Sequence, residues 1–206
     1  MNNVARRGFI FGSATLVSYG LLVGVQRVCF SAFANDQADD ESAYRIVTII
    51  QFADDGARLG AKSLAKVHRT NQEWKKLLTP AQYQVTRRAA TEFAYSSGLY
   101  DQHSPGLYRC ACCENALFDS ATKFDSGTGW PSFWAPIASE NIYKKTDTSY
   151  GIVREEVKCT LCDAHLGHVF TDGPEPTGLR YCINSAALRF LPRNNFQIPQ
   201  KTLFDP

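Results

Sequence analysis

The sequence predicts an α+β fold dominated by β-strands and carried by one globular domain. A β-branched run at residues 44–52 favours a strand. Helix-start signals at Thr70 and Thr79 then predict two short helices. From residue 107 to residue 191, short β-rich segments are broken by Gly, Pro and Asp, which is typical of antiparallel sheet.

The N-terminal 34 residues have the pattern of an export signal of the twin-arginine type. Arg6 and Arg7 precede an uncharged stretch at residues 8–26, and Ala32-Phe33-Ala34 is a small-x-small cleavage site. An uncleaved membrane anchor is the alternative, because residues 8–26 are long enough to span a bilayer. We therefore expect an exported, periplasmic protein or one anchored in the membrane. Three parts are expected, namely an export signal at 1–34, a polar linker at 35–43 and a domain at 44–206.

Composition excludes some partners. With 206 residues, 44% of them hydrophobic, the chain can bury a sizeable core. From residue 35 onward, 19 basic residues (22 minus the 3 arginines before it) stand against 20 acidic ones, so no basic patch indicates nucleic acid. We expect a monomer.

Two capping boxes define the helical region. Thr70 and Glu73 form one ahead of Trp74, which is expected in the core. Thr79, followed by Pro80 and with Gln82 at the third helical position, starts the second helix.

Two Cys-x-x-Cys pairs, Cys110/Cys113 and Cys159/Cys162, are separated by 45 residues. Four thiolates supplied in this way are the ligand set of a closed tetrahedral zinc site, which leaves no position for substrate. The zinc is then structural. The alternative is a disulfide framework.

Cys182 lies in a segment whose alternation indicates a strand. One face carries Arg180, Cys182 and Asn184, and the other carries Leu179, Tyr181 and Ile183. The second set is apolar and predicts the core face. Cys182 is therefore expected beside a cation, with a pKa below the usual value of about 8.5 and a reactive thiol. A buried structural cysteine is the alternative.

His165 and His168 follow the second cysteine pair. Their three-residue spacing places them on opposite faces of a regular strand, but Gly167 is a candidate for a β-bulge that turns both toward one site. His165 as a substitute zinc ligand is the alternative.

The segment from Gly127 to Trp134 predicts a sharply turned loop. Glycines flank Thr128, and Pro131 follows Trp130. An aromatic ring held on such a loop is a wall for a small apolar ligand, although packing in the core is an equal alternative.

These motifs together resemble the methionine sulfoxide reductase B family over about residues 74–191. They are the two cysteine pairs, Gly127-Thr128-Gly129-Trp130-Pro131-Ser132-Phe133, His165-Leu166-Gly167-His168-Val169-Phe170 and Arg180-Tyr181-Cys182-Ile183-Asn184-Ser185. The resemblance implies two antiparallel sheets in a small barrel-like domain clamped by zinc. It also implies protein repair after oxidative stress, by reduction of the R epimer of methionine sulfoxide in proteins with a thioredoxin-type thiol as electron source.

The resemblance also implies roles for individual residues. Cys182 matches the nucleophile, and Trp130 the aromatic residue that binds the substrate methyl group. His165, His168 and Asn184 match polar substrate contacts, and we expect Phe133 and Arg180 at the substrate as well. The zinc ligands are Cys110, Cys113, Cys159 and Cys162. Thiolate attack on the sulfoxide sulfur, with a histidine protonating the departing oxygen, would give methionine and a Cys182 sulfenic acid.

One position departs from the family. Many members carry a resolving cysteine where this chain has Thr128. Either an external thiol reduces the sulfenic acid, or Cys112 reaches it after local opening. A zinc-dependent binding module, in which Cys182 is dispensable, and a thiol-disulfide oxidoreductase, in which the cysteine pairs cycle, are the competing classes of function.

Overall fold

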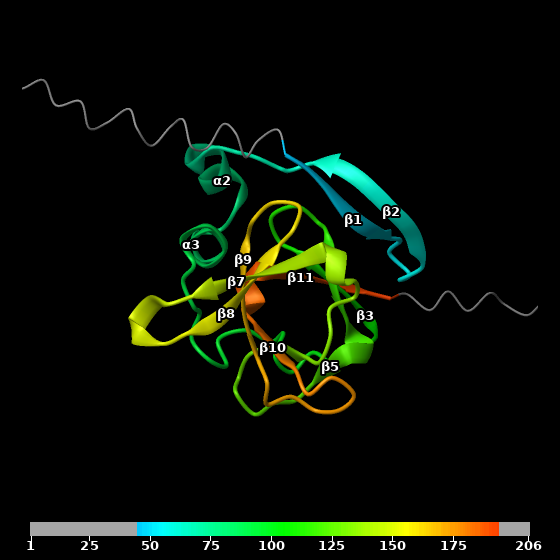
Figure 1. Ribbon diagram of the computed structural model, residues 1–206, viewed down its shortest axis with the longest axis vertical. Coiled ribbons are helices and arrows are strands. Elements are labelled where there is room, and N and C mark those ends of the chain that lie inside the picture. The colour runs from blue at the N-terminus through cyan, green and yellow to red at the C-terminus, as the bar shows by residue number, and fades with distance from the viewer. Residues whose placement is uncertain (1–44, 194–206) are drawn as a thin grey trace, which may run out of the picture. The chain divides into compact units, whose positions relative to one another are not determined.

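A computed structural model describes residues 45–193 and confirms an α+β fold that is mainly β. Two α-helices and eleven strands are present in this part of the chain (Figure 1). The helices are α2 (Asn71–Leu77) and α3 (Pro80–Arg88). The strands are β1 (Ile46–Phe52), β2 (Arg58–Ala65), β3 (Gly106–Cys110), β4 (Ala116–Asp119), β5 (Lys123–Phe124), β6 (Ser132–Phe133), β7 (Ile142–Asp147), β8 (Arg154–Cys159), β9 (His165–Phe170), β10 (Arg180–Ile183) and β11 (Leu188–Pro192).

The strands form three antiparallel sheets. Six strands pair in the order β5-β6-β10-β9-β8-β7, three in the order β11-β3-β4, and β1 pairs with β2. The two larger sheets agree with the resemblance, whereas the β1–β2 hairpin adds a third. The strand β2 was not predicted, because most of its residues are exposed and it lacks the alternation of apolar and polar residues that marks a half-buried strand.

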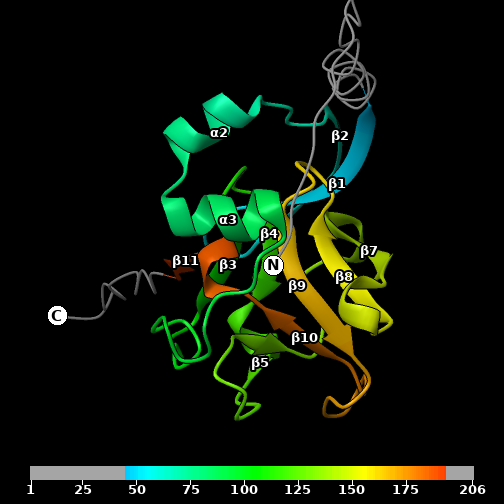
Figure 2. The same ribbon diagram turned by 90° about the vertical axis from the view of Figure 1, so that its left-hand side faces the viewer.

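Both predicted helices are confirmed, together with their capping boxes. The side chains of Thr70 and Thr79 accept hydrogen bonds from the third helical residue, which bonds back to the cap in each case. Trp74 is 2% exposed and packs with Leu78 and Tyr83. In Figure 2, α3 lies against β9 and beside the orange segment that contains the short 3₁₀ helix η4 (Ser185–Ala187).

The main core packs aromatic rings from both larger sheets. Phe133 of β6 stacks on Phe118 of β4, with ring centroids 4.4 Å apart, and meets Tyr108 of β3 edge-on at 4.9 Å. Phe133 is fully buried, which argues against the predicted contact with substrate. Its partner across the ladder is Tyr181, and residues directly opposite each other share a sheet face. Phe133 therefore belongs to the core face, and its neighbour Ser132 lies opposite Cys182.

The predicted export signal and linker lie outside the described residues. Within residues 45–193, no helix is long and apolar enough to cross a membrane.

Candidate active site and metal centre

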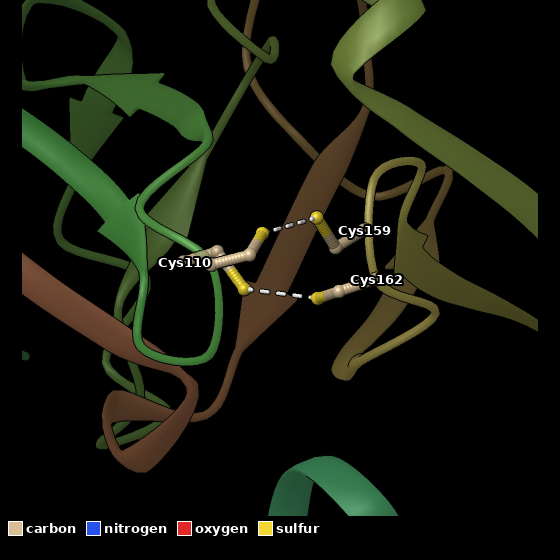
Figure 3. Close-up of side chains that lie close together, drawn as sticks. Cys110, Cys159 and Cys162 are labelled. Carbon is tan, nitrogen blue, oxygen red and sulfur yellow. Dashed lines mark hydrogen bonds between the residues drawn. The ribbon is translucent and has the colours of Figure 1, made fainter. Parts of the chain in front are cut away.

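Two β-hairpins from different sheets bring four cysteines together. Cys110 and Cys113 lie at the turn from β3 to β4, and Cys159 and Cys162 at the turn from β8 to β9. The sulfurs of Cys110 and Cys162 are 3.6 Å apart, as are those of Cys113 and Cys159 (Figure 3). All four sulfurs lie within 4.8 Å of one another. Around a tetrahedral zinc with bonds of about 2.3 Å, neighbouring sulfurs would be about 3.8 Å apart, so the cluster fits this metal.

The two turns share one backbone geometry. Glu114 and Asp163, each directly after a second cysteine, have positive φ angles of 62° and 58°. Their N–H groups donate to the carbonyls of Cys110 and Cys159, at 2.9 Å in both cases. Asn115 donates from Nδ2 to the sulfur of Cys159 at 3.6 Å. The same cradle is therefore built twice, and a hydrogen-bond donor faces one sulfur.

The structure argues against the disulfide framework. A disulfide bond is about 2.0 Å long, much shorter than the sulfur separations in the cluster. All six cysteines between residues 45 and 193 are free.

Cys182 lies on β10 as its alternation predicted. Tyr181 and Ile183 are buried, whereas Arg180 and Cys182 are partly exposed on the opposite face. In the sheet, Cys182 pairs with His168 on one side and with Ser132 on the other. The thiol is therefore presented on the outer face of the six-stranded sheet, next to a histidine.

The expected low pKa of the thiol is wrong for this structure. Burial raises the pKa of Cys182 above its ordinary value, because the thiolate loses hydration. The charge of Arg180 and hydrogen bonds from Thr128 and Arg180 oppose this shift without overcoming it. The cation beside Cys182 was predicted correctly from the sequence, but the depth of the thiol was not visible there.

Arg180 is fixed beside Cys182 by two other groups. Its Nε and Nη2 donate to the two carboxylate oxygens of Asp172, both at 2.9 Å. The guanidinium also lies 4.6 Å from the ring centroid of Phe170. These contacts hold the cation near the thiol, and contact of Arg180 with substrate stays a prediction.

The predicted bulge at Gly167 is confirmed. Val157 pairs with Gly167 and Lys158 pairs with His165, so Leu166 is the extra residue on β9. The rings of His165 and His168 consequently come within 5.5 Å, in an edge-on arrangement. Both histidine side chains therefore lie on the same side of the sheet as Cys182.

Each histidine is held by a carboxylate that sequence reasoning missed. His165 Nδ1 lies 2.7 Å from Glu156 Oε1, and His168 Nε2 lies 2.8 Å from Asp147 Oδ2. Arg154 donates to the same Asp147 oxygen at 2.7 Å. Both acids come from β7 and β8, and only the strand register shows that they reach β9.

These contacts shift the pKa values of His168, Asp147 and Glu156. Burial lowers the pKa of His168, and its hydrogen bond to Asp147 opposes that shift. Hydrogen bonds from Ser149, then from His168, hold the pKa of Asp147 well below its ordinary range. Burial of Glu156 favours its neutral form, but the hydrogen bond with His165 and nearby cations still keep its pKa below the ordinary value. The acids are therefore anions that can stabilise a protonated histidine.

His165 is almost fully buried, at 2% exposure, and its Nε2 has no hydrogen-bond partner among residues 45–193. The ring lies outside the cysteine cluster, and its other nitrogen is held by Glu156, so the structure does not support His165 as a zinc ligand. A cavity of about 380 Å³ adjoins the ring. Its lining is Thr86, Arg87, Arg88, Ala89, Lys158, Asp163 and His165.

Trp130 lies on the predicted turned loop and outside the core clusters. Gly127 and Gly129 have φ angles of 67° and 84°, a conformation that favours glycine. The indole is half-buried, and its Nε1 donates to the carbonyl of Glu92 at 3.2 Å. The ring is thus anchored at one end while part of it stays accessible.

Asn184 takes a different position from the one predicted. The strand ends at Ile183, and Asn184 is 3% exposed. Its Oδ1 accepts from the N–H of Glu92 and its Nδ2 donates to the carbonyl of Leu166, both at 3.0 Å. Its amide therefore connects backbone segments on both sides of the site, and direct contact with substrate stays a prediction.

Comparison with known proteins agrees with this site. The SelR domain family matches residues 78–192. The chain is 55% identical to the peptide methionine sulfoxide reductase MsrB of Herminiimonas arsenicoxydans over 125 residues, which cover 61% of this chain and 91% of the relative. The enzyme of the same name from Pseudomonas savastanoi pv. phaseolicola is 55% identical over 128 residues, or 62% of this chain and 98% of the relative. Because the family match covers more than half of the chain and includes the cysteine cluster, both histidines and Cys182, the chain belongs to the methionine sulfoxide reductase B family.

Proposed function

We propose that this protein reduces the R epimer of methionine sulfoxide in proteins to methionine. The observation that carries the proposal is the position of Cys182, paired across the ladder with His168 on the outer face of the sheet. Two histidines, each bonded to a carboxylate, stand on the same side of that sheet. A nucleophile next to a proton donor is the arrangement that sulfoxide reduction needs.

In the proposed reaction, the Cys182 thiolate attacks the sulfoxide sulfur. His168, held at Nε2 by Asp147, donates a proton from its other ring nitrogen to the departing oxygen, because the carboxylate stabilises the imidazolium form. The attack forms a transient bond between the Cys182 sulfur and the substrate sulfur. The sulfur–oxygen bond of the substrate then breaks as the protonated oxygen passes to the Cys182 sulfur, and the sulfur–sulfur bond breaks as methionine leaves. The oxygen remains on Cys182 as a sulfenic acid, so the thiol is oxidised by two electrons and the sulfoxide is reduced by two. Trp130 would contact the methyl group of the substrate.

Zinc is proposed as the metal of the four-cysteine cluster. Cys110, Cys113, Cys159 and Cys162 would fill all its positions, so zinc would supply structure and take no part in the reaction.

Regeneration of Cys182 is proposed to use an external thiol of the thioredoxin type. Thr128 lies close enough to Cys182 to lower the pKa of the thiol, and its hydroxyl is 2.8 Å from the Ser126 hydroxyl, so the loop next to the thiol carries a hydroxyl instead of a second sulfur. Cys112 lies inside the first cysteine turn and packs against the Trp74 cluster. These contacts restrict its movement toward Cys182.

Export to the periplasm as a monomer is also proposed. Its support is the pair Arg6 and Arg7 ahead of the uncharged stretch, together with the small-x-small site before residue 35.

The test of the function is the Cys182→Ser variant beside the parent, with peptides that carry separated R and S epimers. We expect the parent to reduce the R epimer, and the variant to remain folded with its metal and lose turnover, since a serine hydroxyl is a much poorer nucleophile at neutral pH. The Cys112→Ser variant is the matched control and should keep most of its activity. An active serine variant, or equal rates on both epimers, would rule the proposal out, and cycling of the cysteine pairs would favour a thiol-disulfide oxidoreductase.

A further inference from the structure

Glu92 lies in the segment between α3 and β3 and makes backbone contacts with both sides of the proposed active site. Its carbonyl accepts the Trp130 indole N–H at 3.2 Å. Its N–H donates to Asn184 Oδ1 at 3.0 Å. Trp130 precedes β6 and Asn184 follows β10. Glu92 therefore connects the loop that carries Trp130 to the segment that follows the Cys182 strand.

The Glu92 carboxylate fixes this segment in place. Its two oxygens accept the N–H groups of Ser185 and Ala186, at 2.6 and 2.9 Å. These N–H groups open the 3₁₀ helix η4, whose own cap residue, Asn184, makes no side-chain cap bond. Glu92 thus donates its N–H to the side chain of the cap residue Asn184 and accepts the first two N–H groups of η4, so a segment more than 90 residues away in the chain caps this helix. Bonds to an ionised acceptor are stronger than neutral ones.

We infer that Glu92 is a positioning residue for the reaction at Cys182. This inference rests on the proposed function. Glu92 touches neither the thiol nor either histidine in its hydrogen bonds, so it acts through Trp130 and the turn after Cys182. The Glu92 carboxylate is bonded to the turn after Cys182, and the Glu92 carbonyl accepts the Trp130 indole N–H. Loss of the carboxylate would therefore free the Glu92 backbone, and the Trp130 ring would shift relative to the Cys182 thiol.

The experiment compares Glu92→Ala and Glu92→Gln with the parent. For a methionine sulfoxide peptide, we expect kcat/KM of the alanine variant to fall by about 10- to 100-fold, the range for a displaced positioning group. The glutamine variant keeps one acceptor oxygen and should recover part of the loss. Alkylation of Cys182 by iodoacetamide, which needs no aromatic wall, should match the parent.

A second measurement reports on geometry without activity. We expect the Trp130 indole N–H to exchange its hydrogen faster in Glu92→Ala than in the parent. The exchange is measured by NMR, and the indole signal is assigned by its loss in the Trp130→Phe variant. The matched control is Glu73→Ala, which removes a carboxylate that accepts the N–H and hydroxyl of Thr70, both at 2.8 Å, at the start of α2. This control should lose stability but keep kcat/KM.

Two outcomes would overturn the inference. One is a parental kcat/KM in Glu92→Ala, and the other is parental exchange at Trp130. If the alanine variant does not fold, the glutamine variant decides by the same two measurements. If the parent itself fails to reduce methionine sulfoxide, the proposed function is wrong, and the exchange of Trp130 still tests the role of Glu92.

Discussion

Cys182 is subject to opposing effects on its ionisation. Burial disfavours the thiolate, whereas Arg180 and Thr128 favour it. The net shift favours the protonated thiol. A protonated thiol is less prone to oxidation, since thiolate character controls that reaction.

A prediction at the residue scale concerns Arg180. Replacing it with methionine removes the cation but keeps an apolar chain of similar length, so the pKa of Cys182 should rise further. Thiolate is the alkylated form, hence alkylation of Cys182 at pH 7 should slow severalfold and its pH profile should move to higher pH. The measurement is the iodoacetamide rate against pH, with Arg180→Lys as the control that keeps the charge. An unchanged profile in Arg180→Met would contradict this account of the thiol.

His165 and His168 differ in their burial and in their position relative to Cys182. His165 is buried behind Glu156, whereas His168 lies on the partly exposed side and opposite Cys182. Burial lowers the pKa of His168, which makes its proton easier to give up, and Asp147 keeps the protonated form accessible. The position of His168 opposite Cys182 supports its proposed role as proton donor.

At the element scale, the bulge in β9 decides whether the two histidines meet. A Cβ atom added at Gly167 would lie 2.0 Å from the Cys182 carbonyl oxygen, on the neighbouring strand. Only a residue without a side chain lets β9 and β10 approach this closely.

We therefore expect Gly167→Ala to destabilise the domain by about 2–4 kcal/mol, because the backbone must shift to relieve the overlap. Activity should fall in the fraction that still folds, since both Cys182 and His168 lie on the displaced strands. Urea unfolding measures the first effect and peptide reduction the second. The control is Gly98→Ala, where no atom lies within 4 Å of the added Cβ. Equal stability of the two variants would refute the role assigned to Gly167.

The loop before β6 gives a second prediction at this scale. Thr128 lies close enough to Cys182 to lower the pKa of the thiol, so we expect a cysteine in its place to reach the sulfenic acid. After one turnover without reductant, we expect Thr128→Cys to contain a disulfide with Cys182, and the parent to contain a sulfenic acid. Mass analysis of trapped protein distinguishes the two products.

The matched control for this substitution is Thr146→Cys on β7. Three strand spacings, or about 14 Å, separate β7 from β10, too far for a disulfide. A disulfide between Cys112 and Cys182 in the parent would instead identify Cys112 as the resolving residue.

Local signals made much of this arrangement predictable. The capping boxes, the alternation around Cys182 and the glycine bulge all depend on neighbours within a few residues. The misses depend on pairings between distant segments. Asp147 and Glu92 reach the site only through strand register or a loop, and neither belongs to a short motif.

Membership in a motif also says little about which face a side chain takes. Phe133 was expected at the substrate, yet its pairing with Tyr181 places it in the core. Alternation along β10 placed Cys182 on the correct face. The same argument could assign a face to Phe133 only if the register of β6 were known.

Across the domain, the cysteine cluster joins the three-stranded sheet to the six-stranded sheet. The second cysteine turn also holds two other elements. The N–H of Val67 donates to the carbonyl of Leu161 at 2.8 Å, and Arg87 of α3 donates to the carbonyl of Cys162 at 2.8 Å. Release of this turn would therefore loosen both sheets, the helix and the segment after β2.

We expect loss of zinc to unfold much of the domain. Structural zinc sites contribute about 10–16 kcal/mol, which equals or exceeds the total stability of about 5–15 kcal/mol of a typical domain. The purified parent should contain one zinc per chain, and Cys113→Ser should lose the metal and the near-ultraviolet circular dichroism of the folded core. Cys112→Ser is the control at the adjacent position, since its sulfur lies outside the four-cysteine cluster, and it should keep the metal. We expect the zinc site to affect activity only through the fold. A metal-free protein that stays folded and fully active would show that core packing alone holds the two sheets together.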